Sequence, residues 1–186
     1  MIRCRPGSDF CYTDDEMTTM LSDIKFYKDM GVDRFVFGAL TDTKGIDKIN
    51  CGKVIEMARP LPVTFHRAFD LCAHPDEALV DIINLGFDRL LTSGLQPLAT
   101  TSEAVETLKR IKTKHGHEIS IMPGSGINSK NVEQFVIEAF PIVHSSCKKK
   151  LTKNTDDGDI NMGSNDIYIT DERLVRELKL VLDKRE

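Results

Sequence analysis

Short apolar segments alternate with amphipathic helical patterns along nearly the whole chain. Each helical pattern carries apolar residues three or four positions apart, as Met17, Met20, Leu21 and Ile24 do in the first. The apolar segments are predicted strands, at residues 1–6, 32–37, 63–66, 89–92, 119–122 and 142–144. Strands and helices in this order form a parallel sheet covered by helices, so the predicted fold class is α/β.

An internal repeat supports this prediction. Residues 31–38 resemble residues 86–94, because each stretch has a helix-ending glycine, an Asp-Arg pair, an apolar strand and a small residue at the strand exit. The two copies begin 55 residues apart, at Gly31 and Gly86, which is the length of two strand–helix units. On strand count alone, six strands allow an open doubly wound sheet, whereas a closed barrel needs eight.

The predicted organisation is a body at residues 1–147, a flexible loop at 148–165 and a helical segment at 166–186 that packs on the body. The loop is predicted because residues 148–165 are polar and rich in Gly, Asp and Asn. Ser129 is predicted to cap the helix after the glycine turn at residues 123–126, and Thr170 or Asp171 to cap the last helix.

Composition narrows the classes of partner and compartment. A length of 186 residues suits one domain with a real core. The net charge is −4 and the basic residues are scattered apart from Lys148-Lys149-Lys150, which argues against nucleic acid or an anionic membrane as partner. The five cysteines lack paired spacing, which favours a reducing cytosol, and no secretory leader or membrane span is expected.

Protonatable residues cluster where the third predicted strand ends. His66, Arg67 and Asp70 lie within five residues directly after an apolar segment. Because parallel strands end on a common face, we expect these residues to meet other polar residues at strand exits in one pocket. The further members are Arg3, Arg5, Gly38, Thr92, Ser93, Gly124, Ser125, Gly126, His144 and Ser145.

These residues suggest an enzyme-like site for a small anion. His66 is the candidate general acid or base, since imidazole titrates near neutrality, with Asp70 or a neighbour orienting it. Arg3, Arg5 and Arg67 would hold a phosphate or carboxylate together with the backbone N–H groups of Gly124-Ser125-Gly126. Simpler interpretations stay open: Arg67 and Asp70 pair with each other, the histidines pack as core residues, and the glycines serve a tight turn.

Metal ligands cannot be assigned from spacing. The sequence has no Cys-x-x-Cys, His-x-x-x-His or Met-x-Cys pattern. Cu(I) favours thiolate and thioether ligands, and Cys4, Cys11 and Cys147 lie near strand ends. Strand alternation, however, places Cys4 on the face opposite Arg3, where it packs under a helix.

Six blocks of sequence together resemble the CutC family of copper homeostasis proteins. They occur in the family's order, at residues 2–12, 36–41, 60–70, 91–94, 121–127 and 143–146. The resemblance implies a TIM-type βα barrel, a cytosolic protein that can also be nuclear, a homo-oligomer, and copper, as Cu(I), as a ligand. It implies no settled reaction, so enzymatic activity is left unassigned.

The chain departs from the family at its start, because the resemblance begins at the family's third strand. The expected fold is therefore an N-terminally truncated barrel of about six parallel strands, which cannot close at the usual tilt. Segments 1–6 and 142–144 would be edge strands that invite association, or the chain is a truncated product.

Three hypotheses for function follow. The first is a copper homeostasis protein that binds or buffers Cu(I). The second is an enzyme acting on a small anionic metabolite at the strand exits. The third is a non-catalytic structural or regulatory subunit.

Overall fold

The computed structural model describes residues 1–7, 9–151 and 167–184. The first part of the chain contains α1 (Asp14–Asp29), β1 (Phe35–Phe37), α2 (Lys48–Ala58), β2 (Val63–Phe65), a 3-10 turn (Arg67–Leu71), α3 (Pro75–Leu85) and β3 (Arg89–Thr92). It continues with α4 (Ser102–His115), β4 (Ser120–Pro123), α5 (Glu133–Ile137), β5 (Lys148–Leu151), β6 (Ile167–Thr170) and α6 (Glu172–Asp183).

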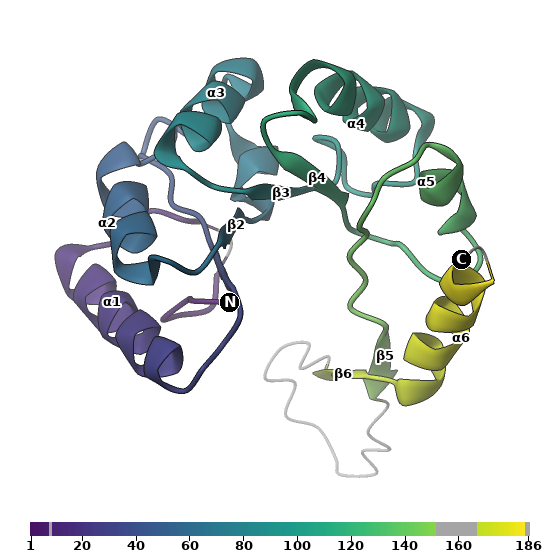
Figure 1. Ribbon diagram of the computed structural model, residues 1–186, viewed down its shortest axis with the longest axis horizontal. Coiled ribbons are helices and arrows are strands. Elements are labelled where there is room, and N and C mark those ends of the chain that lie inside the picture. Colours follow the sequence, from purple (N-terminus) through teal and green to yellow (C-terminus); the bar gives the residue numbers. More distant parts are fainter. Residues whose placement is uncertain (8, 152–166, 185–186) are drawn as a thin grey trace, which may run out of the picture.

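Four parallel strands form the central sheet in the order β1-β2-β3-β4. The helices between them lie along the outer side of an arc, with the strands on its inner side (Figure 1). Spatial order equals sequence order, as in a βα barrel, and does not reverse as in a doubly wound sheet. The predicted α/β class with parallel strands is confirmed.

The prediction of about six parallel strands is wrong, because the first and last segments form no regular strand. Residues 1–6 pair with the sheet through one backbone bond, from Ile2 N to Val36 O at 2.9 Å. Residues 142–144 make a single parallel bridge, with His144 N donating to Pro123 O at 2.8 Å. Among the described residues, neither segment extends this single contact into a ladder.

The segment predicted as a flexible loop is partly a strand. Residues Lys148–Leu151 form β5, which pairs antiparallel with β6 in the register Lys148–Thr170 to Leu151–Ile167. The Lys148 ammonium lies 4.5 Å from the centre of the Tyr168 ring, a cation–π contact across the ribbon. The rest of the predicted loop, residues 152–165, falls outside the described residues.

Local signals account for most helix ends. Thr13 and Glu16 form a reciprocal capping box at the start of α1, and Gly86 ends α3 in the left-handed conformation with φ +92°. Asp171 caps α6, accepting a bond from Arg173 N at 2.9 Å. The predicted Ser129 cap is wrong: α5 begins at Glu133, because asparagine side chains take up the amides of the preceding turn.

One apolar core joins the sheet to the helices. Phe35, Phe37 and Phe65 are buried with the α1 residues Met17 and Met20 in the same cluster. Leu178 of α6 belongs to this cluster too. No helix among the described residues is long and apolar enough to cross a membrane.

Candidate functional site

A pocket of about 490 Å³ opens at the C-terminal ends of the strands. It is lined by Met1, Arg3, Phe10, His66, Arg67, Leu91, residues 125–129, residues 144–148 and Leu174. The exits of β2 and β4 thus meet the N-terminal segment and the residues before β5 at one place. The geometry brings His66, Arg67, Ser125, Gly126, His144 and Ser145 together, as the sequence predicts for strand exits.

The charge of this pocket is one-sided. Arg3, Arg67 and Lys148 line it, and no aspartate or glutamate does so among the described lining residues. Asp70, which follows Arg67 by three positions, lies behind the wall with its side chain 7% exposed. The pocket surface therefore presents cationic groups, which attract an anion.

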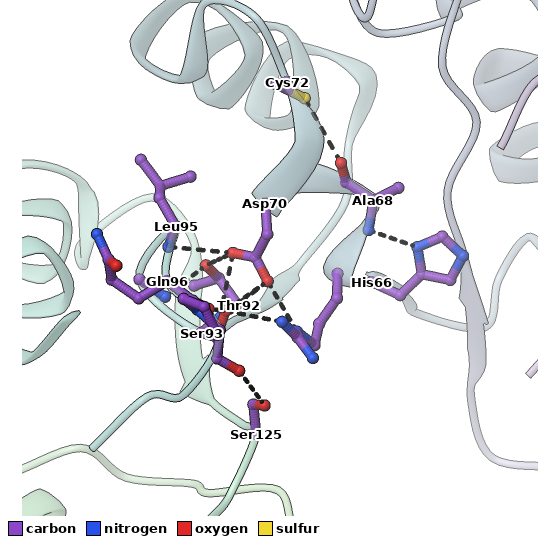
Figure 2. Close-up of polar contacts among 12 residues, drawn as sticks. His66, Ala68, Asp70, Cys72, Thr92, Ser93, Leu95, Gln96 and Ser125 are labelled. Atoms are coloured by element: carbon purple, nitrogen blue, oxygen red, sulfur yellow. Dashed lines mark hydrogen bonds and ion pairs between the residues drawn. The ribbon is translucent and has the colours of Figure 1, made fainter. Parts of the chain in front are cut away.

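Asp70 is the hub of the polar network behind the pocket (Figure 2). Its carboxylate accepts bonds from Ser93 N at 3.1 Å and Leu95 N at 3.3 Å. It also accepts from the Thr92 hydroxyl and from Arg67 Nε at 2.8 Å. One buried side chain thus ties the turn after β2 to the loop after β3.

Arg67 is held in place at the pocket wall. Its Nε donates to Asp70, and its Nη2 donates to Ser93 Oγ at 2.9 Å. The Ser93 hydroxyl lies near both Asp70 Oδ2 and Gln96 O, and its single proton can go to either. The Arg67 side chain stays 41% exposed, so a fixed guanidinium faces the pocket.

His66 is buried and neutral. Its residue is 5% exposed, and its ring packs against Phe10 at 4.7 Å between centroids. Nδ1 accepts a bond from Ala68 N at 3.2 Å (Figure 2), and the buried Nε2 has no partner among the described residues. Burial, together with the positive charge of Arg3, lowers the pKa of His66 to about 4.

This shift predicts a pH-dependent loss of stability. The native state keeps His66 neutral down to about pH 4, whereas an unfolded chain protonates it near 6.5. The unfolded state therefore binds more protons in that window, and the stability present above pH 6.5 falls as the pH drops towards 4. We expect His66 to account for up to about 3 kcal/mol of this loss. Urea unfolding of wild type and His66→Gln at several pH values measures it, and equal pH slopes would contradict it.

The opposite wall is built from the turn after β4 and the segment that follows α5. Ser125 has φ +105°, a conformation rare for a residue with a side chain, and its hydroxyl donates to Pro97 O at 2.8 Å. The Ser145 hydroxyl donates to Ile127 O at 2.6 Å. Burial and the charge of Arg67 lower the pKa of His144, so this imidazole too favours its neutral form.

Some residues predicted for the site lie elsewhere. Arg5 does not line the pocket, because its guanidinium pairs with Asp9 and Glu16 and stacks over Tyr12. Thr92 and Ser93 are fully buried beneath the pocket, where they bind Asp70.

Two predicted roles also need correction. Asp70 does not orient His66, since the partner of His66 Nδ1 is the Ala68 amide. The Gly124 amide donates to Thr92 O at 2.9 Å and cannot serve an anion. Arg3 reaches the pocket, but its guanidinium is tied to backbone carbonyls and lies 4.7 Å from the centre of the Phe10 ring.

Sequence reasoning missed several lining residues. Cys147 is predicted near a strand end without being assigned to the pocket, and Lys148, the next residue, was missed although it shares that position. Phe10 and Leu174 reach the pocket through chain folding that no local pattern indicates.

The described residues offer no closed metal site. No group of three or more His, Cys, Asp or Glu side chains gathers within the part of the chain that the structure covers. Burial raises the pKa of Cys51 to about 12 and that of Cys72 to about 11, so both stay protonated thiols at neutral pH. Cys147 lines the pocket, and its thiol lies 3.4 Å from Ser145 Oγ.

A family model and the curated relatives point to one family. The model of the CutC family matches residues 1–149. The human copper homeostasis protein cutC homolog is 41% identical over 155 residues, which are 83% of this chain and 55% of that protein. The Caenorhabditis elegans homolog is 37% identical over 185 residues, covering 98% of this chain and 73% of that protein.

A solved structure agrees with the fold. The putative copper homeostasis protein CutC from Streptococcus agalactiae superposes with a TM-score of 0.68 and 27% identity, covering 77% of this chain and 69% of that one. The arc of strands and helices is thus a TIM-barrel-type fold. The chain spans about half the length of its human relative. With the family model matching most of its residues, this chain belongs to the CutC family.

Proposed function

We propose that this protein acts in copper homeostasis and binds Cu(I) as cargo. The observation that carries the proposal is the match of the CutC family model over residues 1–149, together with relatives named as copper homeostasis proteins. We also propose that the protein is cytosolic, which cell fractionation tests and a secreted protein would contradict. We propose that it self-associates, which light scattering tests and a stable monomer would contradict.

The pocket offers donors of the kinds that Cu(I) accepts. Met1 supplies a thioether, Cys147 a thiol and His144 an imidazole, and all three line the same cavity. The proposed donors come from the N-terminal segment and from residues 144–147, which meet at this cavity.

Removal of the Cys147 thiol should weaken Cu(I) binding. We expect Cys147→Ser to lower Cu(I) affinity by roughly tenfold or more, because a hydroxyl is a poor ligand for a soft cation. The measurement is an anaerobic Cu(I) titration against a chromophoric competitor. Cys72→Ser is the matched control, since that thiol donates to Ala68 O away from the pocket. Equal affinities of wild type and Cys147→Ser would reject Cys147 as a ligand.

A second candidate function is binding, and turnover, of a small anionic metabolite. The charge of the pocket favours it, since Arg3, Arg67 and Lys148 line the cavity and no described lining residue is a carboxylate. Arg67 is fixed by Asp70 and Ser93, so its guanidinium is preorganised to meet an oxyanion. In this candidate His66 and His144 are the groups available for hydrogen bonding or proton transfer. If neither Cu(I) nor an anion binds, the third hypothesis, a non-catalytic subunit, is favoured.

A further inference from the structure

We infer that His66 is a fixed hydrogen-bond donor through Nε2–H, and that the ligand it serves in the pocket carries an oxyanion. This inference rests on the second candidate function above, the anion-binding pocket. It goes beyond that candidate by naming the tautomer of His66 and by excluding a metal ion at its Nε2.

The tautomer follows from the partner of Nδ1. A backbone amide can only donate, and Ala68 N lies 3.2 Å from His66 Nδ1. Nδ1 must therefore offer a lone pair, and the proton of the neutral ring sits on Nε2. The ring cannot readily turn away, because it packs on Phe10, and a Cβ at Gly38 would lie 2.6 Å from Nδ1. The small residue after β1 thus keeps room for this ring.

The donor lacks a protein partner. His66 Nε2 is buried and makes no hydrogen bond to any residue that the structure describes. A buried N–H without an acceptor is costly, and such groups in native proteins have a partner in nearly every case. None of the described residues lining the cavity is a carboxylate that could accept this proton. We therefore assign the missing acceptor to the ligand.

His66 shares the cavity lining with the cationic residues Arg3 and Arg67. β2 pairs with β3 in the register Phe65–Leu90, so His66 comes next to Leu91, and both line the pocket. Arg67 follows directly in the chain. An oxyanion in this cavity can accept hydrogen bonds from the Arg67 guanidinium and from the His66 Nε2–H. A cation there would face that proton and the positive charge of Arg67. A metal ion at Nε2 would need the proton on Nδ1, facing the Ala68 amide.

Nuclear magnetic resonance of the ring nitrogens tests the tautomer directly. Long-range ¹H–¹⁵N spectra of histidine-labelled protein distinguish the two neutral forms, and loss of one signal set in His66→Phe assigns His66. We expect the Nε2–H form at neutral pH. Titration with inorganic phosphate should shift the Nε2 signal, and addition of Cu(I) should not. An Nδ1–H form, or Cu(I) bound at Nε2, would overturn the inference.

Two substitutions separate the donor from the ring. His66→Phe keeps the aromatic packing but has no N–H, and we expect it to weaken phosphate binding by about 10- to 100-fold. His66→Gln keeps an N–H donor and should lose about threefold or less. Equal losses in both variants, with the fold intact by circular dichroism, would overturn the donor role.

A third variant tests the pocket itself. Arg67→Ala should weaken phosphate binding in the same titration. If wild type binds no phosphate, the anion-binding candidate fails and the ligand part of the inference fails with it. If phosphate binds and Arg67→Ala weakens it while both His66 variants bind as wild type, the candidate stands and the inference is wrong.

Discussion

Replacement of Asp70 by alanine should destabilise the protein by about 3–5 kcal/mol. The side chain is 7% exposed and accepts bonds from two backbone amides, those of Ser93 and Leu95. It also pairs with the Arg67 guanidinium and accepts from the Thr92 hydroxyl. Alanine would leave the two backbone amides and the Thr92 hydroxyl without their acceptor in a site that water reaches poorly, and each unsatisfied buried donor costs free energy. Denaturant unfolding, analysed as a two-state transition, measures the loss.

Asp76→Ala is the matched control for this prediction. Asp76 pairs with Arg110 on the surface, with side chains 62% and 51% exposed, and such pairs contribute about 1 kcal/mol at most. Asp70→Asn should fall between the two, because the amide keeps the shape but loses the charge and turns an NH2 group towards donors. If Asp70→Ala costs no more than Asp76→Ala, the network behind the pocket does not hold the two loops together.

Local patterns in the sequence predicted those elements whose ends depend on neighbouring residues. Gly86, predicted as a helix end, closes α3, and Asp171, one of the two predicted caps, caps α6; Pro75 at the start of α3 follows the same rule. In each case the chain itself provides the preset φ, the left-handed turn or the capping oxygen. The parallel order of β1 to β4 followed because strands and helices alternate without a break.

Strands at the margins could not be predicted in the same way, because a strand exists only with its partner. Residues 1–6 have an apolar, alternating character but meet the sheet at one bond, so no ladder forms. Lys148–Leu151, by contrast, is a polar stretch that becomes a strand because Ile167–Thr170 lies opposite. Its composition alone is typical of a loop.

The candidate site was predictable as a place and less so as a set of roles. Strand exits gather at one face by topology, which brought His66, Arg67 and His144 to one pocket. Roles depend on side-chain direction and on competing partners. Arg5 is taken up by Asp9 and Glu16, and Asp70 serves the loop after β3 rather than His66. Both outcomes require knowledge of which groups are nearest in space.

The loop after β3 depends on a glycine at position 94. Gly94→Ala should destabilise the protein by about 2–5 kcal/mol, since two costs add. Gly94 has φ +71°, which disfavours any residue with a Cβ. A Cβ there would also lie 2.5 Å from Ala104 O, and this neighbour is helix backbone that cannot swing aside.

The same substitution reaches the pocket. The Gly94 amide donates to Thr92 Oγ1 at 3.0 Å, and Thr92 in turn donates to Asp70, so a shift at residue 94 disturbs the anchor of Arg67. We therefore expect phosphate binding to weaken together with the free energy of unfolding. Gly52→Ala is the control, because Gly52 lies in α2 with nothing within 4 Å of the added Cβ. It should stabilise the protein by about 0.5–1 kcal/mol. A Gly94→Ala protein as stable as wild type would mean that the loop after β3 adapts freely, and then Asp70 could not hold Arg67 rigid.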